Sequence, residues 1–111
     1  YMLSRFNRIL TNLDVFPETM KANMNRTYGL IYSQRLLLKL IESGLSREAA
    51  YDLVQPLTAQ AWDEQRQFRP LVEANSEITA RLTPAQIADA FDYHYHLRRV
   101  DEIFKRLGLL D

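Results

Sequence analysis

Apolar residues recur at helix-like intervals along the whole chain, and strand-like alternation of useful length is absent. Near the start they follow one another at steps of three and four residues, the spacing of one helix face. This pattern predicts a first helix from the start of the chain to about residue 12. Its apolar stripe comprises Met2, Phe6, Ile9, Leu10 and Leu13.

No capping residue precedes this first helix, because the chain opens with Tyr1. Helices usually begin after Ser, Thr, Asp or Asn, whose side chains accept hydrogen bonds from free amides. We therefore expect a chain cut inside a helix. The alternative is a native start whose first residues have been trimmed.

Proline and an acidic residue mark the start of a second, short helix over residues 17–25. The fixed φ of Pro17 suits a first helical position, where the missing N–H removes no hydrogen bond. The carboxylate of Glu18 complements the positive end of the helix dipole.

The most apolar stretch predicts a third helix over residues 27–42, ended by Gly44 in a left-handed conformation. Its apolar residues spread around most of the helix, which is typical of a central core helix. They are Tyr28, Leu30, Ile31, Leu36, Leu37, Leu38, Leu40 and Ile41.

A fourth helix is expected over residues 46–62, with Ser46 as its N-cap and Glu48 in its first turn. Pro56 lies inside this helix. Because proline removes one backbone hydrogen bond and clashes with the preceding turn, the sequence predicts a kink at residues 52–55.

The remaining residues predict three more helices and one linking stretch. A short helix over 69–75 and a linking stretch over 76–82 come first. Thr83, Pro84 and Gln86 then form a capping-box pattern for a helix that ends near residue 91. Asp92 or Tyr93 caps the last helix, whose apolar stripe ends before Gly108. That stripe is Leu97, Val100, Phe104 and Leu107. The fold class predicted is therefore all-α.

Composition excludes several classes of protein. The 111 residues suit one domain, and 47% hydrophobic with 25% charged residues exclude a disordered chain. Lys+Arg and Asp+Glu are both 14, so no basic excess points to nucleic acid. The absence of Cys excludes disulfides and thiolate chemistry. The apolar stretch at residues 36–41 is too short and too charged for a membrane span, and no signal-peptide pattern opens the chain.

His94 and His96, with Asp89, Asp92 and Asp101 nearby, raise the question of a metal site. Two metal ligands on one helix face normally stand three or four residues apart. A separation of two places the histidines on different faces, so surface or capping histidines are favoured. We predict no metal and no cofactor.

Two adjacent acidic pairs, Asp63–Glu64 and Asp101–Glu102, resemble acid/base pairs only in composition. Neighbouring helical residues diverge, so neither pair converges on a substrate. Solvated charges with Arg or Lys partners are the favoured interpretation.

A dense polar cluster precedes the third predicted helix. In one interpretation Arg26 holds a phosphate or carboxylate with the help of free helix amides. In the other, which we favour, Asn25 or Thr27 caps the helix and Arg26 pairs locally. The cluster also contains Asn23 and Tyr28.

Polar residues inside the third helix, Ser33, Gln34 and Arg35, are expected to find partners on neighbouring helices. A catalytic role for Ser33 would need a positioned base, and no His is near it in sequence. Three aromatic residues, Trp62, Phe68 and Tyr95, are expected in the core or at an interface.

Three stretches of the chain, in their expected order, resemble the adenylosuccinate lyases of the fumarase/aspartase superfamily, in their bacterial form. The first covers residues 15–21, 23 and 26–35, and the second residues 48–56. The third covers residues 91–97, 100–101 and 103–104. Together they extend over nearly the whole chain, which is more specific than a single short motif.

The resemblance implies a two-part organisation. Residues 1–14 would be the truncated end of a long helix in the central bundle, and residues 15–111 the helical C-terminal domain. The family is a cytoplasmic homotetramer of purine biosynthesis. It releases fumarate from adenylosuccinate, giving AMP, and from a succinyl-carboxamide ribotide. The reaction is a β-elimination that needs an acid, a base and stabilisation of an aci-carboxylate.

The family's catalytic machinery has no counterpart in these residues. The flexible loop with the catalytic serine and the two substrate histidines belong to absent regions, and His94 and His96 do not match them. A substrate-binding Ser/Arg segment would lie just before Tyr1. We therefore predict no catalytic, substrate-binding or metal residue here, and an inactive fragment.

The expected partners are the rest of the lyase chain, its other subunits and, for the full enzyme, its nucleotide substrate. Alone, the exposed stripe of residues 1–14 predicts self-association. Two alternatives stay open. One is a free-standing helical interaction module derived from the lyase, and the other a small metal or nucleotide binder using Arg26 or the histidines.

Overall fold

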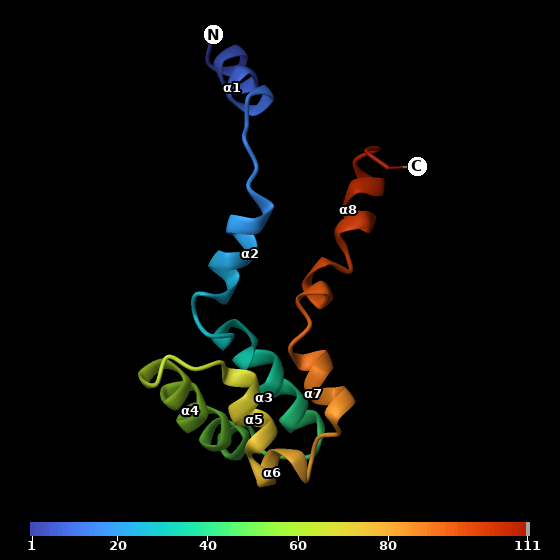
Figure 1. Cartoon of the computed structure of the whole chain (residues 1–111). Helices are drawn as coiled ribbons and strands as arrows, with labels where there is room; N and C mark the ends of the chain where they lie inside the picture. Colours follow the sequence, from blue (N-terminus) through green and yellow to red (C-terminus); the bar gives the residue numbers. More distant parts are fainter. Residues whose placement is uncertain (111) are drawn as a thin grey trace.

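A computed structural model describes residues 1–110, and all regular structure within that range is helical (Figure 1). The predicted all-α class is therefore confirmed. Asp111, the last residue of the expected C-terminal domain, lies outside the described residues. The elements are α1 (Met2–Thr11), α2 (Pro17–Asn25), η1 (Leu30–Tyr32), α3 (Ser33–Glu42), α4 (Arg47–Asp63), α5 (Phe68–Ala74), α6 (Ser76–Thr79), α7 (Pro84–Ala90), η2 (Tyr93–Leu97) and α8 (Val100–Arg106), where η marks a 3₁₀ helix.

The elements form one helical body, made of α3 to α7, from which two arms extend (Figure 1). The N-terminal arm is α1 and α2, and the C-terminal arm is η2 and α8. The radius of gyration is 18.9 Å, whereas a compact chain of this length would have about 13 Å. The arms account for this difference, because they extend from the body toward the same side.

The hydrophobic core lies within the helical body. α3 packs against α4 and α7, while α5 packs against α4 and α6. Phe68 is fully buried and forms a tilted aromatic pair with Phe91, their ring centroids 5.7 Å apart. The buried apolar residues are Leu36, Leu40, Ala50, Val54, Ala61, Phe68, Leu71, Val72, Ile78, Leu82, Ile87 and Ala90.

The prediction of the third helix is wrong for its first residues, 27–32. Tyr28 and Gly29 have positive φ values of 55° and 82°, which interrupt any right-handed helix. A 3₁₀ turn follows, and α3 begins only at Ser33. At this reversal the carbonyl of Tyr28 accepts a hydrogen bond of 2.8 Å from the amide of Phe68, which ties the turn to α5.

The expectation of a central core helix holds for α3, which packs against both α4 and α7. α3 buries Arg35, Leu36 and Leu40, whereas Leu38 remains 49% exposed. The exposed strip also includes Gln34 and Glu42, while Leu37, Lys39 and Ile41 are half-buried, so the rest of the helix is covered by the body.

Cap signals predicted several helix boundaries correctly. The hydroxyl of Ser46 accepts a hydrogen bond of 3.1 Å from the amide of Ala49 at the start of α4. Thr83 and Gln86 form the complete capping box of α7. Pro56 lies inside α4 as expected, and the kink at residues 52–55 stays a prediction.

Removing the capping box should cost measurable stability. We expect Thr83→Ala to lower the free energy of unfolding by about 1 kcal/mol, because the amide of Gln86 loses its acceptor. Thr79→Ala is the control, since the Thr79 hydroxyl donates back to the carbonyls of Asn75 and Ser76 and accepts from no helix amide in the described residues. Urea unfolding followed by circular dichroism measures both, and equal losses would contradict a capping role.

Two further boundaries were wrongly predicted. The expected link over residues 76–82 contains α6, because the Asn75 side chain accepts hydrogen bonds from the amides of Glu77 and Ile78. The expected last helix is divided into η2 and α8. Asp92 caps η2 as expected, through the amide of His94. Tyr95 in η2 packs on the body instead of continuing a regular helix.

Over the described residues, no helix combines the length and the apolar character that a membrane crossing requires.

Candidate functional site

The most densely connected polar group lies where the C-terminal arm leaves the body. Arg35 on α3 is only 9% exposed. Its Nη2 donates to the Asp89 carboxylate at 2.8 Å and to the Asp89 backbone carbonyl at 3.0 Å. Lys39, one turn further along α3, places its Nζ 3.0 Å from the same carboxylate. One acidic side chain of α7 therefore binds two cations of α3.

Tyr95 links this ion-pair group to the C-terminal arm. The guanidinium carbon of Arg35 lies 3.4 Å from the centroid of the Tyr95 ring, and that of Arg98 lies 3.9 Å from it. Van der Waals contact alone takes about 3.5 Å, so two groups on one face would overlap. The ring is therefore held between two guanidinium groups. We call Arg35, Lys39, Asp89, Tyr95 and Arg98 the Arg35–Tyr95 cluster.

The hydrogen bond between Lys39 and Asp89 shifts the pKa of both groups in the direction that keeps each of them charged. The bond from Lys39 holds the pKa of Asp89 below its usual 3.8, and the same bond raises the pKa of Lys39 above 10.5. Asp89 thus adds stability above its usual pKa and loses it as pH falls through the lowered value. Lys39 adds stability below its usual pKa and loses it as pH rises through the raised value. The ion pair is fully formed at neutral pH.

One donor in the cluster has no partner. The Nε of Arg35 is buried and makes no hydrogen bond among the described residues. Leaving a buried donor unpaired costs about 1–3 kcal/mol. Such a group marks a position where an additional acceptor would be favourable.

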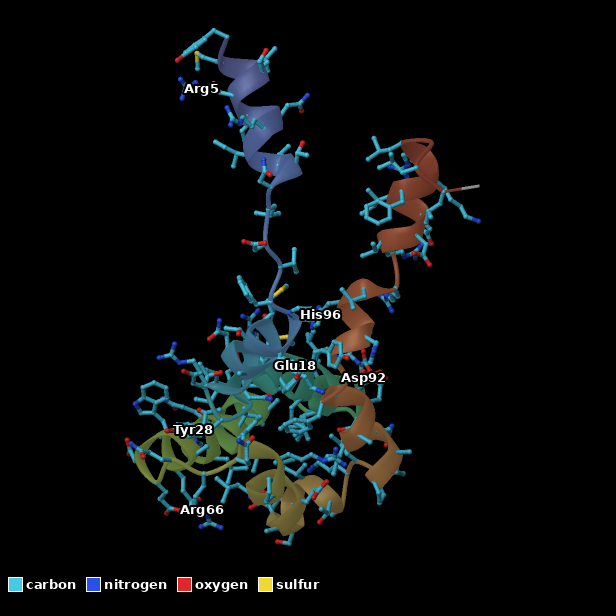
Figure 2. The ribbon with its side chains drawn as sticks, turned by 45° about the horizontal axis from the view of Figure 1, so that its top comes forward. Arg5, Glu18, Tyr28, Arg66, Asp92 and His96 are labelled. Carbon is cyan, nitrogen blue, oxygen red and sulfur yellow. The ribbon has the colours of Figure 1, made fainter. Side chains whose placement is uncertain are left out.

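A cavity of about 400 Å³ adjoins the cluster. Figure 2 shows His96, one of its lining residues, on η2, the part of the C-terminal arm that lies next to the body. Ile31 and Leu38 give the cavity an apolar wall, and Glu42 adds one carboxylate. The other lining residues are Gln34, Arg35, Lys39, Tyr95 and Arg98.

The structure brings Asp92 and His94 together but does not gather the five candidate metal ligands at one point. His94 stacks on Tyr93, and its Nδ1 lies 2.8 Å from Asp92. The hydrogen bond from the His94 amide is the main cause of the lowered pKa of Asp92. Asp89 binds Arg35 and Lys39 instead. Between residues 1 and 110, no group of three His, Asp or Glu side chains has the arrangement of a metal site.

The two acidic pairs are exposed, as expected for solvated charges. Glu64 accepts hydrogen bonds from Gln60 and Arg66, and these lower its pKa. Glu102 pairs with Arg99 at 2.7 Å. The partners predicted for the glutamates are thereby confirmed. Their neighbours Asp63 and Asp101 form no ion pair within residues 1–110.

The favoured interpretation of the polar cluster before α3 is wrong. Neither η1 nor α3 has a side-chain cap, so Asn25 and Thr27 do not cap this helix. The hydroxyl of Thr27 is buried without a partner in the described part of the chain. Arg26 is exposed, as is Asn23, and Arg26 forms no ion pair there. The left-handed turn at Tyr28 removed the helix start that these caps required.

The other singled-out residues divide between core and surface. Phe68 is a core residue and Tyr95 lies between arm and body, both as predicted. Trp62 is 57% exposed and meets Tyr28 edge-on. Ser33 lines a separate cavity from the one that His96 lines, so the structure does not pair this serine with a histidine.

Sequence reasoning singled out Arg35 and Tyr95 of the Arg35–Tyr95 cluster and missed the part played by the other three members. It predicted that Arg35 needs a partner on a neighbouring helix, which Asp89 confirms. It considered Asp89 only as a metal ligand and overlooked Lys39 and Arg98. The four-residue step from Arg35 to Lys39 was an available signal, since it places both cations on one helix face.

The two arms present large apolar side chains that the other described residues leave exposed. α1, α2 and α8 contain no buried residue. On α1, Arg5 lies over the ring of Tyr1, and Figure 2 shows Arg5 well away from the helical body. The large exposed apolar residues of the arms include Met2, Leu3, Phe6, Ile9, Leu10, Leu13, Met20, Ile103, Phe104 and Leu107. Patches of this extent are typical of surfaces that bind another chain.

Comparison with known proteins gives consistent matches. The family described as "Adenylosuccinate lyase C-terminus" matches residues 29–107. The chain is 64% identical to adenylosuccinate lyase of Bacillus subtilis (strain 168) over 98% of its length, covering 25% of that protein. It is 60% identical to the enzyme of Streptococcus mutans, over 100% of the chain and 26% of that protein. It is 49% identical to adenylosuccinate lyase of Staphylococcus saprophyticus, over 98% of the chain and 25% of that protein. The chain thus spans about a quarter of the length of these relatives, and it belongs to the adenylosuccinate lyase C-terminus family.

Proposed function

We propose that the chain is the helical C-terminal domain of an adenylosuccinate lyase. The full-length enzyme would cleave adenylosuccinate to AMP and fumarate, and a succinyl-carboxamide ribotide to its carboxamide, by β-elimination in the cytoplasm. The observation that carries this proposal is the identity of 49–64% across nearly the whole chain to proteins named adenylosuccinate lyase.

Within that enzyme, residues 1–14 would continue a helix of the central bundle and the following residues would form the third domain. The exposed stripe of α1 supports this division, because a helix with one apolar face needs other helices to cover it. The covering helices would come from the rest of the chain and from other subunits of a homotetramer.

In this account the domain contributes structure and not reacting groups. β-Elimination needs a positioned acid and base together with charge stabilisation. We assign those roles to the preceding domains, and no catalytic, substrate-binding, metal or cofactor residue to this chain. The isolated chain would therefore not turn over adenylosuccinate.

A chimaera tests the proposal. The chain would replace the matching C-terminal quarter of the Bacillus subtilis lyase, and adenylosuccinate cleavage would be followed by ultraviolet absorbance. We expect activity within about tenfold of the parent enzyme, because 64% of the aligned residues are identical, and none from the chain alone. A folded but inactive chimaera would favour the free-standing interaction module. Turnover by the chain alone would contradict the division of roles.

Self-association of the isolated chain provides a separate check. We expect concentration-dependent dimers or larger species in analytical ultracentrifugation, because Phe6 and Ile9 expose 57% and 63% of their surface. Phe6→Glu should shift the distribution toward the monomer. Thr11→Glu, a charge-matched control at the exposed end of α1, should change it much less. A chain that stays monomeric at high concentration would refute this expectation.

A further inference from the structure

We propose that the cavity between α3 and η2 binds a small oxyanion group, a phosphoryl or carboxylate group on a small molecule. Arg98 and Lys39 would bind the anion directly, while Arg35 would hold the binding surface in place. This inference does not depend on the lyase role proposed above.

Charge is the first argument. Three cations, Arg35, Lys39 and Arg98, line the cavity, and the nearby carboxylates are Asp89 and Glu42. Asp89 is already shared between Arg35 and Lys39. The balance next to the cavity is therefore positive, although the chain as a whole has zero formal charge.

The geometry of Arg98 is the second argument. Its Nη2 donates to the Tyr95 hydroxyl at 2.9 Å, and its guanidinium stacks on the Tyr95 ring. It makes no ion pair within residues 1–110. A guanidinium held over an aromatic ring, with N–H groups left over, can donate to two oxygen atoms of an anion.

An unmet donor is the third argument. Arg35 is nine-tenths buried, and its Nε lacks a hydrogen-bond partner. The Arg35 side chain lines the same cavity. Asp89 already pairs with the charge of Arg35, and an oxygen atom of an anion in the cavity would supply the acceptor that the Nε lacks.

The cavity also limits the kind of ligand. Its volume of about 400 Å³ suits a small molecule. Ile31 and Leu38 would pack against an apolar part of the ligand, and the Gln34 amide adds a hydrogen-bonding group. Glu42 at the side would repel a second anionic group. The expected ligand therefore carries one oxyanion group on a small, partly apolar body.

Titration with inorganic phosphate, and separately with acetate, tests the proposal on the 111-residue chain. Arginine Nε–Hε signals in nitrogen-15 NMR report the site directly. We expect saturable shifts of the Arg35 and Arg98 signals, with a Kd on the order of millimolar that rises with added sodium chloride. Whichever of the two anions binds more tightly identifies the ligand as phosphoryl or carboxylate.

Three variants make the result decisive. Arg98→Gln should weaken binding about tenfold, the loss expected for one charge-assisted contact. Glu42→Gln should strengthen it about threefold by removing a repulsive charge. Arg106→Gln, the same change on exposed α8, should leave the Kd within about twofold. Circular dichroism confirms that each variant is folded.

Shifts that rise linearly without saturation for both anions would overturn the proposal. So would equal effects of Arg98→Gln and Arg106→Gln, since these would indicate a general charge effect and not a site.

Discussion

Replacing Phe68 by alanine should lower the free energy of unfolding by about 3–5 kcal/mol, the largest effect of any single substitution considered. The Phe68 side chain is fully buried, and the backbone amide of Phe68 donates a hydrogen bond to the carbonyl of Tyr28. Truncation would leave a cavity among the aromatic and aliphatic side chains around it, in addition to the lost transfer free energy. The total free energy of unfolding of a domain of this size is only about 5–15 kcal/mol.

The matched control is Phe104→Ala on α8, where the side chain is 42% exposed. That change should cost less than about 1 kcal/mol in the isolated chain, because no core surrounds it. Urea titration of both variants, with thermal melting as a second readout, measures the difference. Similar losses would mean that the core is not where the structure places it.

Arg35→Ala should lower the free energy of unfolding by about 2–3 kcal/mol and release the C-terminal arm. The substitution removes the two bonds to Asp89 and one of the two cations that hold Tyr95. Asp89 is half-exposed and keeps Lys39, so its charge is not left unpaired and the loss is smaller than for a fully buried pair.

Arg35→Lys separates charge from shape at the same position. It keeps the positive charge but removes the planar stack on Tyr95, so we expect about half of the loss and still a mobile arm. The measurements are urea unfolding and the backbone heteronuclear NOE of residues 93–97. Arg106→Ala, at an exposed position of α8, is the control. Unchanged NOE values in Arg35→Ala would show that the stack does not hold the arm.

Local signals predicted much of the fold. The starts of α2, α4 and α7 follow from Pro17, Ser46 and the Thr83 box, because caps act within one turn of the chain. Helix-like periodicity was sufficient for the all-α class. These features depend on residues that are close together in the sequence, so the sequence alone is enough to predict them.

The errors occurred where distant contacts decide the conformation. The turn at Tyr28 and Gly29 is tied to α5 by the bond to Phe68, and η2 is held by the stack of Tyr95 on Arg35. Neither contact leaves a periodic signal. The same limit applies to the Arg35–Tyr95 cluster, because Asp89 lies 54 residues from Arg35 in the chain. Sequence could indicate that Arg35 needs a partner, but not which one.

Hydrogen exchange on the isolated chain and on the Bacillus subtilis chimaera tests the central proposal. In that proposal the helical body folds by itself, and the rest of a lyase covers the two arms. At low protein concentration we expect protected amides in α3 and α4 of the isolated chain and nearly unprotected amides in α1, α2 and α8. In the chimaera the arms should become protected as well. Arms that are equally protected in both proteins, or that stay unprotected in the chimaera, would contradict it.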